Sequence, residues 1–174
     1  AETIVQTWLV DFIQQVHATY PLLELQIDVG ASDVMRSQLL SRHLDVAFML
    51  GPLREPRVEN LPLGGYPLAW VASPSLELPP EPLELAQVAQ FPIITYPAHS
   101  RPYQVLRDML VRGGVAHPRM YGSASLSMVA RMALARIGVA VITPVFLAKE
   151  LSAGTLRLID VRSGPLPDPV FTAT

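Results

Sequence analysis

The sequence predicts an α/β fold in which two Rossmann-like lobes are joined by two crossovers. Helical and strand-like patterns alternate along the chain with short joints, as in α/β proteins. Two proline-rich segments, residues 74–82 and 163–169, have the stiffness that suits connections between lobes. We therefore expect residues 1–74 with residues 167–174 to form lobe I and residues 75–166 to form lobe II. In such an architecture ligands bind in the cleft between lobes, at strand ends and helix N-termini.

The first expected element is a helix with one broad apolar stripe, because its apolar residues recur at i, i+1, i+4 and i+5. Thr3 and Gln6 have the form of a capping box at its start. Pro21 ends it, since the residue before a proline is pushed out of the α region. The stripe comprises Ile4, Val5, Trp8, Leu9, Phe12, Ile13 and Val16.

Leu23–Val29 alternates between apolar and polar residues. This pattern predicts a strand with one wet or partner-facing side, near a sheet edge. A helix over about residues 33–43 follows, with Met35 in its buried stripe. Val46–Leu50 is a continuous apolar run, which is typical of a fully buried parallel strand.

The same alternation of helices and strands continues to the end of the chain. Extended stretches are expected at residues 57–63 and 66–73, antiparallel or at a sheet edge because of Pro62 and the glycine pair after it. The other expected helices are residues 83–90, 102–112, 125–135 and 144–154. The other expected strands are residues 92–95, 119–122, 139–143, one that begins at Leu156, and residues 170–174.

The composition excludes several classes of protein. Half of the 174 residues are hydrophobic and 16% are charged, so the bulk of the chain is not disordered. No uninterrupted apolar run reaches the roughly 18 residues of a membrane span, so we expect no membrane partner. The net charge of −2 argues against a nucleic-acid-binding face in this piece. The absence of cysteine excludes disulfides and fits a reducing compartment, so we expect a cytoplasmic protein.

Four stretches give the chain a resemblance to a known family. They are Tyr20–Leu25, Leu44–Phe48, Leu68–Pro74, and Ile137–Pro144 with Glu150–Leu156 behind it. In this order and spacing the chain resembles the effector-binding domain of bacterial LysR-type transcriptional regulators, which has the type 2 periplasmic binding protein fold. The resemblance implies a ligand-sensing regulatory domain that binds a small carboxylate effector in the interlobe cleft. It also implies that the domain forms a homodimer or homotetramer. We expect no cofactor.

The resemblance further implies elements that this chain lacks. The family pattern has a strand just before Ala1 and further helix after Thr174, and DNA is contacted only through an N-terminal helix-turn-helix. The chain departs from the family at Arg42 and Arg136, where members often have glycine. This departure leaves open how the two preceding helices end.

No catalytic or metal-binding set is found, so we expect the chain not to be an enzyme. The four histidines are far apart in sequence and form no i, i+4 ligand pair. The serine-nucleophile pattern G-x-S-x-G does not occur. Ser125, in the stretch that begins at Gly122, is better explained as the cap of the next helix.

Several helix N-termini are expected beside strand ends, where unpaired N–H groups and the helix dipole favour a carboxylate. Arg101 is the one cation between Thr95 and Pro102, and it either pairs with an anionic effector or lies in solvent. We include Arg101 in the predicted effector site. The residues that the resemblance implicates in effector binding are Thr3, Gly30, Ala31, Thr95, Tyr96, His99, Ser100, Ser125, Thr143, Pro144 and Val145.

Alternatives stay open at this point. Each Ser or Thr at a helix start could serve only as a cap. The whole chain could be a periplasmic solute-binding protein of a transport system with the same fold. An enzyme of this fold, such as a dehydratase, would need an acid–base set that the sequence does not show.

Self-association is expected at the helix of residues 33–43 and the alternating strand before it. The resemblance implies that these elements pair antiparallel between two copies, in an isologous contact. Glutamate in place of Met35 or Gln38 should weaken the dimer, unless those residues belong to the core.

Overall fold

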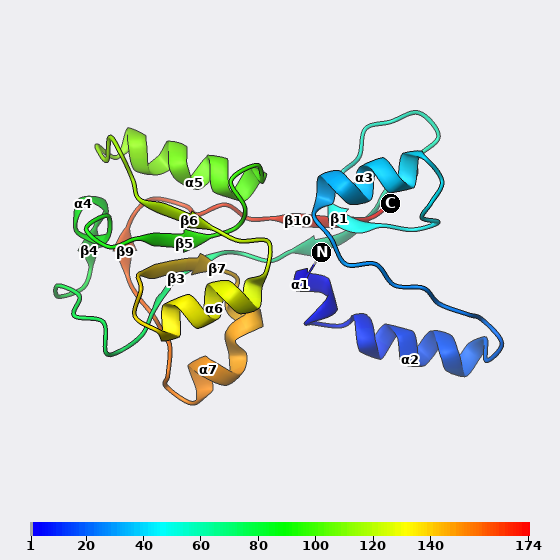
Figure 1. Cartoon of the computed structure of the whole chain (residues 1–174), viewed down its shortest axis with the longest axis horizontal. Coiled ribbons are helices and arrows are strands. Elements are labelled where there is room, and N and C mark those ends of the chain that lie inside the picture. The colour runs from blue at the N-terminus through cyan, green and yellow to red at the C-terminus, as the bar shows by residue number, and fades with distance from the viewer. Residues whose placement is uncertain (1) are drawn as a thin grey trace. The chain divides into compact units, whose positions relative to one another are not determined.

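The computed structural model describes residues 2–174, whose contacts divide into two units (Figure 1). The first unit comprises residues up to Gly65 together with Val170–Thr174, and the second comprises Tyr66–Pro169. The chain therefore passes between the units twice. The sequence places residues 66–74 in lobe I, whereas the structure has them in the second unit because residues 69–72 pair with two of its strands.

The first unit contains a three-stranded antiparallel sheet with the order β1-β10-β2. Helix α3 covers β1, and Met35, Ala47 and Met49 form a small buried cluster between them. The strands are β1 (Phe48–Leu50), β2 (Leu61–Gly65) and β10 (Val170–Ala173). The helices are α1 (Glu2–Val5), α2 (Leu9–Thr19) and α3 (Ser32–Leu40). The prediction of a fully buried parallel strand at Val46–Leu50 is wrong, since β1 is antiparallel and lies at the edge of its sheet.

The expected first helix is interrupted. Between α1 and α2, Thr7 Oγ1 donates to the carbonyl of Thr3 at 2.9 Å, and such side-chain bonds compete with the regular helix ladder. Thr3 lies inside α1 and is buried, so the predicted capping box is wrong. Ile4 and Leu9 of the apolar stripe are buried, but Phe12 is 44% exposed.

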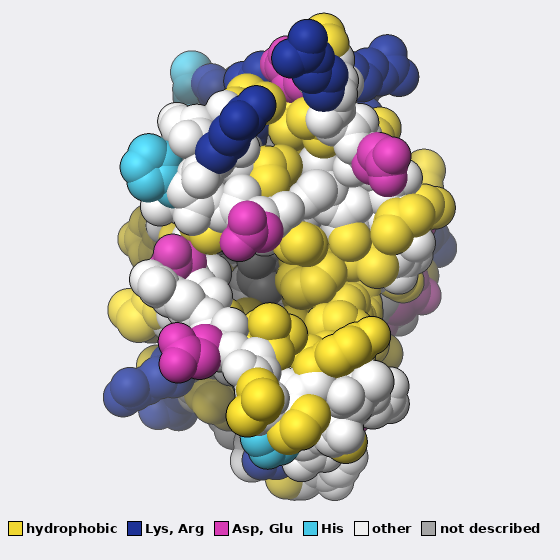
Figure 2. Space-filling view, turned by 90° about the vertical axis from the view of Figure 1, so that its right-hand side faces the viewer, with side chains coloured by type: hydrophobic (Ala, Val, Ile, Leu, Met, Phe, Trp, Pro, Cys, Tyr) yellow, Lys and Arg dark blue, Asp and Glu magenta, His cyan; other side chains and the backbone are white. Residues whose placement is uncertain are grey.

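The predicted strand at Leu23–Val29 is not formed. Residues 23–30 form neither helix nor strand, and Leu23, Leu25, Ile27 and Val29 are about half exposed. A strand needs a neighbour for its N–H and C=O groups. Among the described residues β1 pairs only with β10, so its other edge is unpaired as well. Figure 2 shows exposed apolar side chains gathered on one face of the first unit.

The second unit is built on a five-stranded sheet with the order β6-β5-β7-β3-β8. Strands β6, β5 and β7 are parallel, and β3 is antiparallel to β7 and β8. The strands are β3 (Ala69–Ala72), β5 (Ile93–Thr95), β6 (Met120–Gly122), β7 (Val139–Ile142) and β8 (Arg157–Leu158). Strands β4 (Leu83–Glu84) and β9 (Val161–Arg162) form a separate parallel pair.

Helices cover both faces of this sheet, with α5 on one side and α6 and α7 on the other (Figure 1). Successive strand residues point to opposite faces. Accordingly Val139 and Val141 join the core beneath α5, while Ala140 and Ile142 join the core beneath α6. The helices are α4 (Leu85–Val88), α5 (Arg101–Arg112), α6 (Leu126–Leu134), the 3₁₀ turn η1 (Pro144–Leu147) and α7 (Ala148–Ser152). The α/β prediction is confirmed.

Candidate functional site

The carboxyl ends of β6, β5 and β7 lie side by side in the second unit, and most of the predicted effector residues follow them. Thr95, the last residue of β5, is in register with Gly122, the last residue of β6. Thr95 Oγ1 donates to the carbonyl of Val141 in β7 at 2.8 Å. Parallel strands present ligand sites at this edge. The carboxyl-terminal residues of these three strands therefore lie along one edge of the sheet of the second unit.

Gly122 allows two of these segments to approach closely. A Cβ on Gly122 would lie 2.9 Å from the carbonyl oxygen of Tyr96 and 3.2 Å from the nitrogen of Ala98. Both are backbone atoms, so any larger residue would push the loop after β5 away from β6.

Ser100 and Ser125 are helix caps, as one of the alternatives held. Ser100 Oγ accepts from the N–H of Tyr103 at the start of α5. Ser125 Oγ accepts from the N–H of Met128 at the start of α6, at 3.3 Å. These hydroxyls organise the loops that carry the strand-end site.

Thr143 behaves differently from the two serines. It follows β7 directly, occupies the N-cap position of η1, and makes no side-chain cap bond there. Its side chain is fully buried, and Oγ1 has no hydrogen-bond partner within residues 2–174. A buried hydroxyl without a partner costs about 1–3 kcal/mol. Thr143 Oγ1 is therefore a buried polar atom beside the strand ends whose hydrogen-bonding capacity is unused among the described residues.

The segments around the strand ends carry no acidic side chain. Residues 93–104, 120–128 and 139–147 contain no Asp or Glu. Arg101 is exposed in the first turn of α5, His99 is exposed just before it, and Tyr96 is half-buried. Helix N-termini beside a cation attract carboxylates and phosphates.

The other predicted residues are placed as follows. Pro144 and Val145 begin η1, where Pro144 is half-buried and Val145 is exposed. Thr3, Gly30 and Ala31 belong to the first unit, where Ala31 is the N-cap residue of α3.

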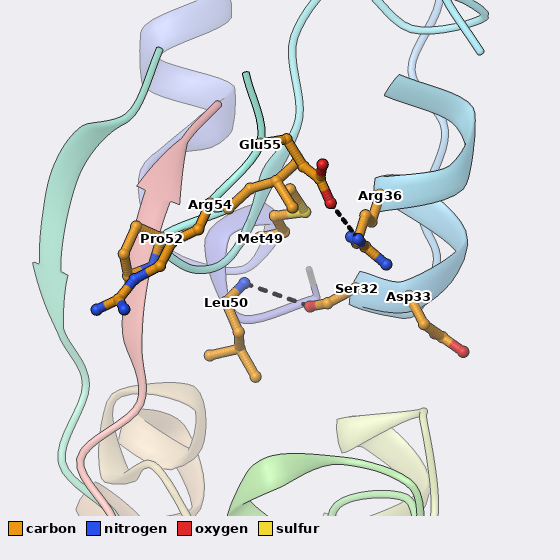
Figure 3. A pocket seen from close by; sticks show the side chains of 9 residues that line it. Ser32, Asp33, Arg36, Met49, Leu50, Pro52, Arg54 and Glu55 are labelled. Carbon is orange, nitrogen blue, oxygen red and sulfur yellow. Dashed lines mark hydrogen bonds and ion pairs between the residues drawn. The ribbon is translucent and has the colours of Figure 1, made fainter. Parts of the chain in front are cut away.

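A pocket of about 450 Å³ in the first unit is absent from the sequence predictions (Figure 3). It lies between the start of α3, the end of β1 and the loop after it. Its residues come from two segments, 32–36 and 49–55, so no single local pattern signals it. The lining residues are Ser32, Asp33, Arg36, Met49, Leu50, Pro52, Leu53, Arg54 and Glu55.

Two kinds of feature are absent from residues 2–174. No group of three or more His, Asp or Glu side chains gathers there in a way that could hold a metal ion. No helix in this range is long and apolar enough to span a membrane.

Comparisons with known proteins give one family and many similar folds. The sequence profile of the LysR substrate binding domain matches residues 1–174. The regulatory domain of CcmR from Synechocystis PCC6803, solved in complex with 2-PG, has a TM-score of 0.78 and 16% identity, over 96% of this chain and 81% of that one. The cofactor-binding domain of the Cbl transcriptional regulator has a TM-score of 0.80 and 16% identity, over 98% and 75%. The regulatory domain of MetR, a LysR family regulator from N. meningitidis, has a TM-score of 0.73 and 18% identity, over 95% and 77%. No curated protein matches the sequence.

Proposed function

Because this chain belongs to the LysR substrate binding domain family, we propose that it senses a small carboxylate at the carboxyl ends of β6, β5 and β7. The family's domains are the effector-binding regulatory domains of LysR-type regulators and have the type 2 periplasmic binding protein-like fold. The comparisons give no support to a periplasmic transport protein. The family is one of regulators, and we propose that this domain has no catalytic activity.

The buried Oγ1 of Thr143 is the observation that carries the proposal. A carboxylate oxygen that accepts from this hydroxyl would satisfy its unused donor. The same carboxylate gains from the N–H groups at the helix starts and from Arg101. The carboxylate then shifts the regulator toward the conformational state that it binds more tightly, by as much as its binding free energy differs between the two states.

Melting temperatures in the presence of simple acids test the proposal. Acetate, pyruvate, benzoate and citrate are added to the wild-type chain, and at least one should raise the melting temperature in proportion to the logarithm of its concentration. Thr143→Val should abolish most of that rise, and Arg101→Gln should reduce it. Arg107→Gln, an exposed arginine two turns further along α5, is the matched control and should leave the rise unchanged.

Thr143→Val also makes a prediction about the ligand-free protein. Since Oγ1 has no partner to lose, removal of the hydroxyl should leave the free energy of unfolding unchanged or raise it by about 1 kcal/mol. Thr95→Val should lower it by about 1 kcal/mol, because the bond to Val141 is lost. Urea unfolding of both variants checks the pair. Equal destabilisation would mean that Thr143 has a structural partner, and a full acid-induced rise in the valine variant would refute the site.

We propose that the chain forms a homodimer or homotetramer through α3, since LysR regulators act as oligomers with DNA. Met35 is core and Gln38 Oε1 is buried, so glutamate at either position tests folding rather than association. Val34 and Leu40 are exposed on α3 and replace them as test positions. If the chain associates through α3, Val34→Glu or Leu40→Glu should dissociate it and so lower its sedimentation coefficient. Sedimentation unchanged from wild type would exclude this face.

We propose that DNA contacts come from an N-terminal helix-turn-helix of the full-length regulator, which acts in the cytoplasm. The coding sequence upstream of Ala1 tests both statements. A helix-turn-helix pattern supports them, and a signal peptide with a small-residue cleavage site refutes them.

A further inference from the structure

The pocket beside α3 is lined only by residues of the first unit (Figure 3). Its volume, about 450 Å³, falls in the usual range of small-molecule sites. Its lining combines four apolar residues with four charged ones, Asp33, Arg36, Arg54 and Glu55.

The apolar part of the lining comes from β1 and the following loop. Met49 is 2% exposed, and Leu50 and Leu53 are half-buried. Ser32 Oγ accepts from the N–H of Leu50 at 3.3 Å and ties the start of α3 to the end of β1. This part of the pocket is therefore held in place, and it fits an aliphatic group.

The charged part is an ion pair that connects the two sides of the pocket. Arg36 on α3 and Glu55 in the loop point toward each other, and Arg36 Nη2 donates to Glu55 Oε1 (Figure 3). Their side chains are 52% and 30% exposed. An exposed ion pair of this kind contributes little to stability, so a ligand can open it at small cost.

The charge of a ligand that opens this pair is constrained. An anion would take Arg36 and leave Glu55 without its partner, and a cation would do the reverse. A molecule with both charges supplies a new partner to each side chain. The lining as a whole also contains two arginines and two acidic residues, which suits a ligand of zero net charge.

We propose that this pocket binds an aliphatic α-amino acid as its zwitterion. The carboxylate accepts from Arg36, the ammonium donates to Glu55, and the side chain contacts Met49 and Leu53. This goes beyond the proposed function, which concerns an anion in the second unit.

The test is calorimetric titration of the 174-residue chain with L-leucine and two analogues. Isocaproate lacks the amino group of leucine, and isoamylamine lacks its carboxylate. Leucine should bind, and each analogue should bind at least about tenfold more weakly, since each loses one charge-assisted hydrogen bond. Arg36→Gln and Glu55→Gln should each weaken leucine binding by a similar factor.

Two further variants show whether leucine binds in this pocket or elsewhere on the chain. Arg57→Gln removes an exposed arginine of the same loop that does not line the pocket, and it should bind leucine as wild type does. Thr143→Val should also leave leucine binding intact. The inference is overturned if leucine does not bind, if isocaproate binds equally well, or if Arg36→Gln has no effect. Loss of leucine binding in Thr143→Val alone would overturn it too, and would assign the amino acid to the strand-end site instead.

Discussion

The two units of this chain bury their apolar residues to different extents. In the second unit both faces of the sheet are covered, and every residue of β7 is fully buried. In the first unit Leu22, Leu23, Leu25, Ile27 and Val29 are all exposed, Leu22 by 95%. An apolar pattern shows which side chains favour burial, but another segment has to pack against them to bury them.

Core truncation should give the largest difference between the units. Leu106 on α5 is fully buried in the core of the second unit, whereas Leu25 is 49% exposed. Leu106→Ala should lower the free energy of unfolding by about 2–5 kcal/mol. Leu25→Ala should change it by less than about 0.5 kcal/mol. Urea unfolding of each variant measures this, and a cost above about 1 kcal/mol at Leu25 would show that the segment is packed in solution.

Glycine contacts provide a second comparison, in which the nature of the obstacle matters. A Cβ on Gly138 would lie 2.1 Å from the carbonyl oxygen of Pro92, a backbone atom of the second unit. A Cβ on Gly51 would lie 2.0 Å from Thr172 Oγ1, a side-chain atom of the first unit. Gly138→Ala should cost about 3 kcal/mol or more, because the backbone has to move, and Gly51→Ala should cost less.

A second substitution sharpens the glycine comparison. Thr172→Ala removes the two nearest of the atoms that a Cβ at position 51 would meet, Oγ1 at 2.0 Å and Cγ2 at 2.7 Å, and leaves the Cβ at 2.9 Å, so it should recover part of the loss in Gly51→Ala. No single truncation does this for Gly138→Ala. Equal losses in the two alanine variants, with no recovery, would contradict the distinction.

The difference between the units also explains which sequence predictions succeed. Helices 102–112 and 125–135 and strands 92–95 and 139–143 are found as α5, α6, β5 and β7. The segments that bury the apolar residues of these elements belong to the same unit. The pattern of Leu23–Val29 is just as regular, yet it forms no strand because no described segment pairs with it.

The candidate site divides in the same way. The caps Ser100 and Ser125 are predictable, because a cap depends on residues three positions away. Whether the hydroxyl of Thr143 has a hydrogen-bond partner depends on which groups the whole fold brings near it. The pocket beside α3 depends on two segments, residues 32–36 and 49–55, that meet only in the folded unit. Neither has a local signature.

Helix ends should respond alike in both units, because they are local. Arg42 follows α3 and Arg136 follows α6, with φ of 60° and 61°, in the left-handed region that glycine favours. Each helix ends with the hydrogen bond that also ends α5 at Gly114, in which the N–H of the following residue donates to the carbonyl five positions earlier. His43 donates to Gln38 after α3, and Ile137 donates to Met132 after α6. The arginines therefore do not change how these helices end.

Glycine at either position should stabilise the protein by about 1 kcal/mol. The left-handed conformation costs an L-residue about 1–2 kcal/mol, and part of the relief is offset because glycine loses more conformational entropy on folding. Thermal unfolding of Arg42→Gly and Arg136→Gly measures the effect. Ala135→Gly is the control. Ala135 has φ of −74°, so glycine there should destabilise. A gain at one arginine only would show that its side chain makes compensating contacts.

The smallest expected effect concerns a surface carboxylate of the second unit. Arg157 and the N–H of Asp160 both donate to Glu81, and they hold the pKa of its carboxyl below the ordinary value of 4.5. A lowered pKa stabilises the folded state above pH 4.5, and this contribution is lost as the pH falls through the folded-state value. Glu81→Gln should therefore lower the melting temperature slightly at neutral pH, and the difference from wild type should vanish in acid. Glu77→Gln removes an equal charge from an exposed position of the same unit and should show no such pH dependence. A Glu81→Gln difference that persists unchanged below about pH 3 would mean that the glutamine distorts the loop rather than removing a charge interaction.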